Sequence, residues 1–399
     1  MSLLQHLADQ LTARRQQSLY RSRRVLESAQ AVEVRCNGTQ FINFSSNDYL
    51  GLANHPQVIA AFKAATDEYG VGSGAAHLIC GHMRPHHRLE EELAEFVGRA
   101  RALLFSTGYM ANLGVISGLL DRHDEVFQDK LNHASLLDAG QLSRATLTRY
   151  RHADPSALNA RLATSRARFR MVATDAVFSM DGDLAPLPEL AQITAENNAT
   201  LMVDDAHGFG VLGENGAGTL EYFDLNAQQV PILMATLGKA LGTFGAFVAG
   251  NDTLIESLIQ QSRSYVYTTA LPPAVAEATR ASLRILKTEP ERRARLHELI
   301  SRFKIGAHQL GLSLMPSDTP IQPLLVGEAQ HAVKLAEALR AKNFLLQAIR
   351  PPTVPEGGAR LRITLSAEHR DEHIDRLLDA LGRLPPELTR VNNVSHVNA

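Results

Sequence analysis

The sequence of 399 residues contains only two cysteines, Cys36 and Cys80, and no tryptophan. The cysteines are far apart and form no CxxC pair, which argues against a disulfide framework or a cysteine metal cluster and indicates a reducing compartment. No run of about 18 apolar residues occurs, so no transmembrane helix is expected. The formal net charge of −2 gives no general attraction to nucleic acid or anionic membranes. We therefore expect a cytoplasmic protein that binds neither.

The first 26 residues are rich in arginine and could be taken for a mitochondrial transit peptide. Asp9 and Glu27 interrupt that pattern, so a helix with a leucine stripe is the preferred interpretation. Asn37-Gly38 in "CNGTQ" is a strong turn signal and predicts a hairpin. Residues 1–45 are thus expected to form a helical arm and a hairpin. The leucines of the stripe are Leu3, Leu4, Leu7 and Leu11.

The middle of the chain, residues 46–289, alternates short apolar runs with helical patterns. This alternation predicts an α/β domain with a mostly parallel sheet covered by helices. In "DPSALNARLATSR", Asp154 followed by Pro155 is expected to cap the start of a helix. From residue 290 a long helical pattern leads into further strands, among them the single run "FLLQAIRPP", and further helices. This predicts a smaller α+β domain over 290–385. The polar residues 386–399 are expected to be a flexible tail.

The segment "ATLGKALG" places Lys239 directly after an apolar run. A lysine at the edge of a buried sheet is costly unless it has a function. Asp204 ends another apolar run, "TLMVDD", and could be a metal ligand, a salt-bridge partner or the partner of a protonated pyridine. A desolvated lysine is a good nucleophile toward aldehydes, and a carboxylate keeps a pyridine ring protonated. Together they indicate pyridoxal phosphate (PLP), whereas Lys239 alone would fit a solvated loop.

A phosphate group needs backbone N–H donors, and "LLFSTGYMANLG" offers them where a strand passes into a helix at Gly108. The alternative is an ordinary strand–helix turn. Gly208, Gly210 and Gly213 match the dinucleotide fingerprint, but loop residues follow where a helix should begin, so nicotinamide is not expected. Gly242, like Gly238, is expected to let the backbone pass close beneath a cofactor.

Five motifs in order carry a resemblance to a known family: "STGYMAN", "DKLNHASLLDAG", "VFSMDGD", "DDAHGFG" and "TLGKALG". Together they resemble the α-oxoamine synthases, fold-type-I PLP enzymes that condense an amino acid with an acyl-CoA. The resemblance runs from about Arg21 to the final helix. "AIRPPTVP", residues 348–355, is similar to the members that join L-alanine to a pimeloyl thioester in biotin biosynthesis.

Two alternatives stay open at this point. One is another member of the family that uses glycine and acetyl-CoA. The other is a non-catalytic subunit of the same fold, against which the intact Lys239, Asp204 and His207 argue.

The resemblance implies roles for five residues around the cofactor ring. Lys239 would form the covalent link to PLP and later move the Cα proton of the amino acid. Asp204 would pair with the pyridinium nitrogen, and His207 and Ser179 would hydrogen-bond the ring 3-oxygen. His133 would stack on the ring face and, as a substrate-binding residue, help to polarise the acyl carbonyl, although it could also be merely a helix cap.

The resemblance also implies a phosphate site and an assembly. Gly108, Tyr109 and Thr236 would hold the cofactor phosphate. Thr269 would reach the phosphate site of a second subunit, so a homodimer is implied.

Four further residues are implied in substrate binding. Arg350 would bind the amino-acid carboxylate as a bidentate fork. Arg21 and Thr353 would contact the acyl-CoA, and Asn47 would line the same pocket. Arg21 stands among other arginines and could instead belong to a charged surface.

The sequence departs from the family in two places. Ala75 and Ala76 stand in a loop where the family has glycine and serine, and Asp175 stands where it commonly has glutamate. A histidine cluster follows that loop, but its spacing fits no known metal site, so no metal is expected. The cluster comprises His77, His82, His86, His87 and Glu90.

Overall fold

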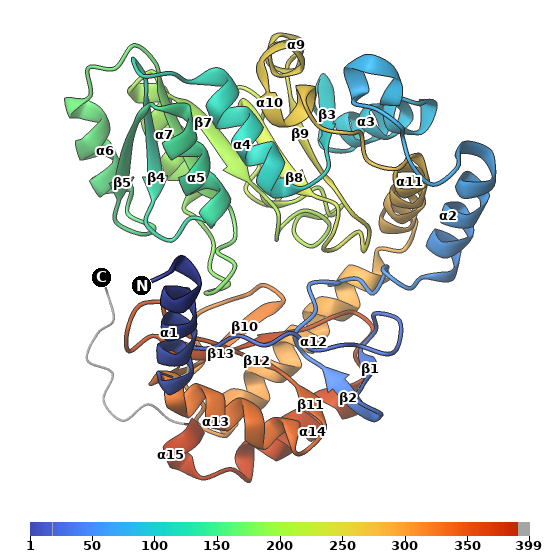
Figure 1. Cartoon of the computed structure of the whole chain (residues 1–399), viewed down its shortest axis with the longest axis vertical. Helices are drawn as coiled ribbons and strands as arrows, with labels where there is room; N and C mark the ends of the chain where they lie inside the picture. Colours follow the sequence, from blue (N-terminus) through green and yellow to red (C-terminus); the bar gives the residue numbers. More distant parts are fainter. Residues whose placement is uncertain (18, 390–399) are drawn as a thin grey trace. The chain divides into compact units, whose positions relative to one another are not determined.

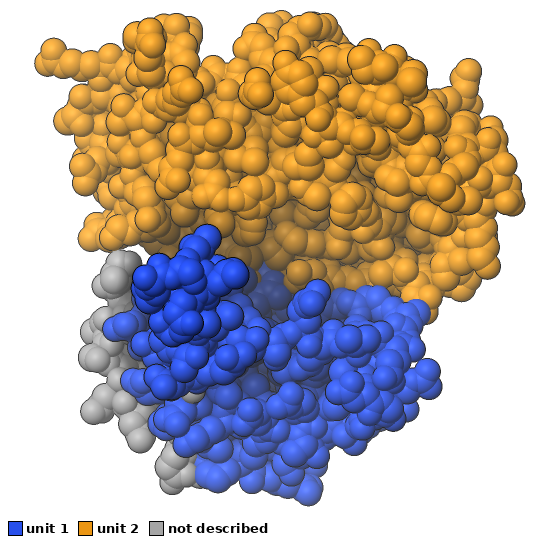
Figure 2. Space-filling view, viewed as in Figure 1, with its two compact units in different colours: residues 1–46, 180–182, 295–398 blue, residues 47–179, 183–294, 399 orange. Residues whose placement is uncertain are grey.

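The computed structural model describes residues 1–17 and 19–389. They form two compact units, which Figure 2 colours separately. One unit comprises residues 1–46, 180–182 and 295 onward, and the other comprises 47–179 and 183–294. The predicted tail falls largely outside the described residues, and helix α15 (Pro386–Thr389) occupies its start.

The larger unit is built on a seven-stranded sheet in the order β3-β9-β8-β7-β6-β4-β5 (Figure 1). β9 runs antiparallel to both of its neighbours, and the other adjacent pairs are parallel. The prediction of a mostly parallel sheet is therefore confirmed. The strands are β3 (Arg101–Phe105), β4 (Glu125–Asp129), β5 (Thr146–Tyr150), β6 (Arg170–Asp175), β7 (Thr200–Asp204), β8 (Ile232–Thr236) and β9 (Ala246–Gly250).

Both faces of this sheet are covered by helices. Successive side chains on a strand point to opposite faces, so neighbouring residues pack into different clusters. Val126 packs into one apolar cluster, with α4 (Gly108–Leu119), α5 (Ala134–Ser143), α9 (Asp252–Gln261) and α10 (Arg263–Val266). Phe127, the next residue, packs into the other cluster, with α6 (Pro155–Thr164) and α7 (Leu187–Glu196). This double burial explains the nearly continuous apolar runs in the sequence.

Local signals set where several helices of this unit begin. The Asp154 side chain accepts the Ala157 N–H at the start of α6, as the sequence predicted. Thr107 likewise accepts the Met110 N–H at the start of α4. The remaining helical elements are α2 (Pro56–Tyr69), the π-turn η1 (His77–Gly81), α3 (Arg84–Phe96), α8 (Thr219–Tyr222) and α11 (Pro273–Thr288).

The smaller unit holds two three-stranded sheets, β1-β2-β11 and β10-β13-β12. The predicted hairpin is present, with Asn37 and Gly38 both at positive φ between β1 (Glu33–Cys36) and β2 (Thr39–Asn43). α1 (Leu3–Gln16) confirms the predicted helix, although none of its residues is buried. The other elements are α12 (Glu291–Gln309, its first turn in the larger unit), β10 (Ile321–Gly327), α13 (Ala329–Arg340), β13 (Ala359–Thr364) and α14 (Asp371–Gly382).

One strand prediction was wrong. The run "FLLQAIRPP" was expected to form a single strand, but it forms β11 (Phe344–Leu345) and β12 (Gln347–Ile349). β11 pairs with β2 and β12 pairs with β13, so the chain changes sheets after Leu345.

Within the described residues, no helix is both long enough and apolar enough to cross a bilayer.

Candidate active site

Three neighbouring strands of the large sheet end in a buried aspartate. Asp129, Asp175 and Asp204 are the last residues of β4, β6 and β7. Asp175 and Asp204 are register partners, so their Cα atoms lie directly across from each other. Ligands of open α/β sheets bind at the carboxyl ends of the strands. We call this edge, with the loop after β8, the carboxyl edge.

Lys239 lies at the carboxyl edge, in the loop after β8, and is half-buried rather than solvated. Its Nζ lies 3.0 Å from Nε2 of His207. The other ring nitrogen of His207 lies 2.7 Å from the Tyr49 hydroxyl, which is 3.3 Å from Oδ1 of Asn47. Lys239, His207 and Asn47, all predicted site residues, are thus joined through Tyr49, which the sequence analysis missed.

Asp204 is held at both of its oxygens. Oδ2 accepts a hydrogen bond from the Asn112 side chain at 2.7 Å, and Oδ1 accepts the Ala206 N–H at 3.0 Å. Asn112 also donates to Ser135 Oγ, which lies 2.7 Å from Nδ1 of His133. A hydrogen-bonded chain therefore links two predicted residues, Asp204 and His133. Asn112 was missed, although it is one of the few polar residues in the mostly apolar helix α4.

His133 is the N-cap residue of α5, and its backbone N–H donates to Asp175 at 2.6 Å. Burial lowers the pKa of the His133 ring, while the negative charge of Asp204 opposes that shift. Burial and the charge of Asp204 raise the pKa of Asp175 well above its usual range. Two buried carboxyl groups on adjacent strands, each disfavouring the negative charge of the other, therefore favour a cation at this place.

The start of α4 lies beside the end of β8, as a phosphate site would require. A Cβ added to Gly108 would come within 3.9 Å of the Thr236 Cβ. The Thr236 hydroxyl donates to the Gly245 carbonyl at 3.1 Å. The Tyr109 ring stands edge-on to the His133 ring, 6.5 Å between centroids, and its hydroxyl donates to Asp138.

Of the two glycines near Lys239, only Gly242 stands where the conformation and surroundings of the backbone require a glycine. Gly242 has φ +65°, and an added Cβ would lie 2.2 Å from the Ala53 nitrogen. At Gly238 an added Cβ would lie at ordinary contact distance, 3.4 Å from the Thr243 oxygen and 3.9 Å from the Thr236 hydroxyl. Close passage of the backbone therefore explains Gly242, but not Gly238.

Asp205, the second aspartate of "DDAHG", holds the loop that follows it rather than contacting the residues around Lys239. Asp205 accepts the Thr219 N–H at 2.8 Å, and a Cβ at Gly208 would come within 2.2 Å of Asp205 Oδ1. Burial raises the pKa of Asp205 to about 7. The glycine-rich segment therefore wraps around a buried carboxyl group and opens no helix for a pyrophosphate.

Two further predicted residues lie in loops of the larger unit. Ser179 is half-buried in the turn that follows β6. Thr269 is exposed and forms a backbone bridge with Ala76, while the Ala270 N–H donates to the Ala75 carbonyl. The two alanines that depart from the family pattern thus make main-chain contacts, which do not depend on their side chains.

The histidine cluster after this loop is largely satisfied by the protein. Side-chain nitrogens of His77, His82 and His86 lie within 4.8 Å of one another. His86, however, accepts the Met83 N–H at one ring nitrogen and lies 2.7 Å from the Leu271 carbonyl with the other. It has no lone pair left for an ion.

In the smaller unit, three predicted substrate residues line one pocket of about 210 Å³. Arg21 donates to the Thr353 hydroxyl at 3.0 Å, and the Thr353 N–H donates to the Arg350 carbonyl. Burial and the nearby charge of Arg21 lower the pKa of Arg350. The pocket therefore gathers two cations and a hydroxyl group, which suits an anionic ligand.

Comparison with known proteins adds to this geometry. The profile of the class I and II aminotransferases matches residues 39–381. An 8-amino-7-oxononanoate synthase from Thioalkalivibrio sulfidiphilus is 61% identical over 381 residues, covering 95% of this chain and 97% of the relative. The chain belongs to the 8-amino-7-oxononanoate synthase family. That family is part of the larger group that the sequence motifs resemble.

Solved structures agree with this family assignment. A variant of serine palmitoyltransferase from S. paucimobilis, with a bound PLP–myriocin aldimine, has a TM-score of 0.91 at 30% identity and covers 96% of this chain and 98% of its own. An 8-amino-7-oxononanoate synthase from Francisella tularensis has a TM-score of 0.75 at 33% identity and covers 86% and 97%. The predicted fold-type-I transferase class is confirmed.

Proposed function

We propose that the protein condenses L-alanine with a pimeloyl thioester, using PLP, to give 8-amino-7-oxononanoate, carbon dioxide and the free thiol carrier in biotin biosynthesis. The carrier is coenzyme A or a carrier protein. The observation that carries the proposal is the joining of Lys239 and His207 next to Asp204 at the carboxyl edge. The identity of 61% to a synthase of this name supports the choice of reaction.

The residues at the carboxyl edge fit PLP. Burial and the charge of Asp204 raise the pKa of Asp175, and a protonated pyridine nitrogen would offset both effects. The start of α4 at Gly108 presents backbone N–H groups and a helix dipole to a phosphate. When bound, PLP supplies an aldehyde that captures amines and a ring that withdraws electrons from the amino-acid Cα.

Each side chain at the carboxyl edge has its own role in the proposed reaction. Lys239 tethers the cofactor, takes the proton from the alanine Cα and later returns one to that carbon. Asp204, fixed by Asn112, holds the proton on the pyridine nitrogen. His207, fixed by Tyr49, hydrogen-bonds the ring oxygen, with Ser179 as a second donor.

The other predicted residues bind the cofactor and the substrates. His133 covers the ring face, and Gly108, Tyr109 and Thr236 hold the phosphate. Arg350 binds the alanine carboxylate through two parallel hydrogen bonds, while Arg21, Thr353 and Asn47 contact the thioester substrate. A bond forms between the alanine Cα and the thioester carbonyl carbon, the thiol leaves, and the carboxylate departs as carbon dioxide.

We also propose a homodimer, because exposed Thr269 is suited to reach the phosphate of a second copy. A cytoplasmic location is supported by the free thiols Cys36 and Cys80. The division into a cofactor domain over 46–289 and a small domain over 290–385 stays a prediction.

The test is a steady-state assay of the PLP-loaded protein with alanine and with glycine, each against pimeloyl-CoA and acetyl-CoA. We expect the highest kcat/KM for alanine with pimeloyl-CoA. A preference for glycine with acetyl-CoA would contradict the proposal and favour the other branch of the family. Release of labelled carbon dioxide from carboxyl-labelled alanine confirms that condensation is decarboxylative.

A further inference from the structure

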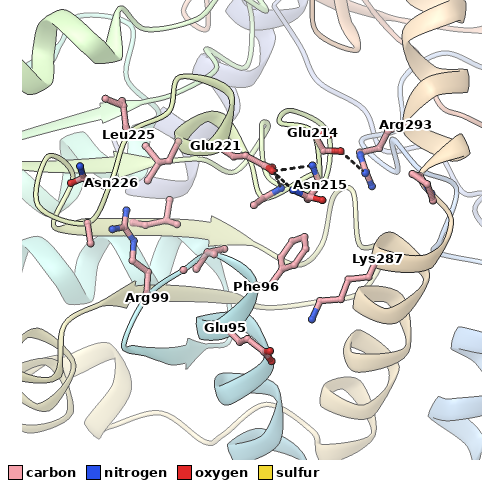
Figure 3. A pocket seen from close by; sticks show the side chains of 17 residues that line it. Glu95, Phe96, Arg99, Glu214, Asn215, Glu221, Leu225, Asn226, Lys287 and Arg293 are labelled. Carbon is pink, nitrogen blue, oxygen red and sulfur yellow. Dashed lines mark hydrogen bonds between the residues drawn. The ribbon is translucent and has the colours of Figure 1, made fainter.

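A groove of about 830 Å³ lies in the larger unit, and Figure 3 shows the side chains that line it. Its walls come from the end of α3, the residues just before β3, the loop at 214–217, the start of β8 and the end of α11. β3 and β8 run in the same direction, since both are antiparallel to β9, so the groove lies at their amino ends. The proposed reaction uses none of the residues that line it.

Arg99, which lines this groove, is a largely buried cation with no partner among the residues that the structure describes. The residue is only 9% exposed, and its buried Nε makes no hydrogen bond. Among the residues that the structure describes, no ion pair or hydrogen bond of its guanidinium is present. Burial lowers the pKa of Arg99, and no neighbouring carboxylate offsets that shift.

The other cations of the groove differ from Arg99, because each has a partner in the protein. Arg293 is similarly buried, but it donates to the carbonyl oxygens of Leu286 and Glu214, both at 2.9 Å. The Lys287 ammonium lies over the Phe96 ring, 5.3 Å from its centroid. The unpartnered state of Arg99 is therefore not a general property of this surface.

The carboxylates of the groove do not serve Arg99 either. Glu221 accepts hydrogen bonds from the Asn215 backbone and side chain and from the Ala217 N–H. These bonds hold the 214–217 loop, as the dashed lines in Figure 3 show. Of the two remaining acids, Glu95 and Glu214, neither forms an ion pair with Arg99 within the described ranges.

A guanidinium whose Nε is buried without a hydrogen bond is costly, and its planar fork matches an oxyanion with two parallel hydrogen bonds. We propose that Arg99 binds the oxyanion group, phosphate or carboxylate, of a small molecule in this groove. The apolar part of that molecule would lie against Phe96, Leu225 and Leu233, which line the same groove.

The test is calorimetric titration of the PLP-loaded enzyme, whose proposed cofactor phosphate site is then already filled. The probes are inorganic phosphate and, separately, hexanoate, a carboxylate with an apolar tail. We expect at least one probe to bind with a millimolar or tighter Kd, and Arg99→Met to weaken that binding by at least about 10-fold. Arg122→Gln, which removes an exposed arginine outside the groove, serves as the matched control and should leave Kd unchanged.

Each outcome bears on the proposal. Binding of neither probe, or equal binding to wild type and Arg99→Met, overturns it, and the probe that binds identifies the oxyanion. If Arg99→Met does not fold, Arg99→Lys keeps the charge but loses the fork, and it should weaken binding several-fold. Unchanged binding to Arg99→Lys would then count against the site.

Discussion

The carboxyl edge of the large sheet and the groove at the amino ends of β3 and β8 hold buried charges in opposite ways. At the carboxyl edge the aspartates have protein partners: Asp204 is bonded to Asn112, and Asp175 to the backbone of His133. Asp129 lies 3.0 Å from a ring nitrogen of His152. In the groove, Arg99 has none within the described residues.

The difference separates two ways of building a binding site. At the carboxyl edge, protein groups fix each charged side chain in advance, which suits catalysis because little reorganisation is needed. In the groove the missing partner has to come from outside the described chain. We therefore expect substitutions at the carboxyl edge to reduce activity or stability, and substitution of Arg99 in the groove not to reduce stability.

The largest effect is expected at Lys239. Lys239→Ala removes the tether and the base together, so turnover should fall by at least about 10³-fold. Steady-state assays measure this, and the visible absorption of bound PLP should be lost in the same variant. Lys63→Ala, an exposed lysine on α2, is the matched control and should keep both. Turnover of Lys239→Ala near the wild-type rate would break the assignment of the carboxyl edge.

Asp204 and Asp205 are adjacent in sequence and should respond differently. Asp204→Asn keeps the hydrogen-bonding shape but removes the charge, so kcat/KM should fall by roughly 10²-fold in a folded protein. Asp205→Asn replaces a carboxyl group whose pKa is raised to about 7 by burial, and should keep most activity. Equal losses in the two variants would show that the charge of Asp204 has no special role.

Local patterns in the sequence were enough to predict the parts of the fold that depend on neighbouring residues. The Asp154 cap and the Asn37-Gly38 turn act through groups only a few residues away, and both are present. Lys239 and Asp204 could be placed at one edge because parallel strands share a direction. Periodicity does not say which sheet a strand joins, and so the change of sheet after Leu345 was missed.

The contacts that complete the site could not be predicted in this way. Tyr49 is 158 positions from His207, and Asn112 is 92 positions from Asp204. Their roles arise from packing between distant segments. Arg99 gives even less of a signal, because an arginine after a glycine at the end of a helix is ordinary until its burial is known.

His152 tests whether a paired cation at the carboxyl edge adds stability. Burial alone would lower the pKa of His152, but hydrogen bonds to Asp129 and Asp183 raise it to about 10. The folded state therefore holds the proton more tightly than the unfolded chain, whose histidine pKa is about 6.5. The stabilisation is complete below pH about 6.5 and is lost as the pH rises toward about 10.

At pH 6, we expect the free energy of unfolding of His152→Gln to be about 2 kcal/mol lower than that of wild type. This difference should close by about pH 10. Urea unfolding at a series of pH values measures the gap. His123→Gln, an exposed histidine in the same unit, should show no such trend. A gap for His152→Gln that stays constant to pH 10 would mean that shape, not charge, holds this residue.

The smallest effect is expected at Arg99, and its sign sharpens the comparison. Arg99→Met keeps much of the side-chain length but removes a largely buried charge that has no partner in the part of the chain that the structure describes. In buffer free of phosphate and carboxylates, we therefore expect the free energy of unfolding to stay within about 1 kcal/mol of wild type or to rise. Urea unfolding of both proteins in such a buffer measures the difference. A loss of about 2 kcal/mol or more would mean that the protein itself stabilises this guanidinium, and the contrast with the carboxyl edge would disappear. An unchanged or higher stability leaves the charge of Arg99 without a structural purpose, and binding of an anion then becomes the physical reason to keep it.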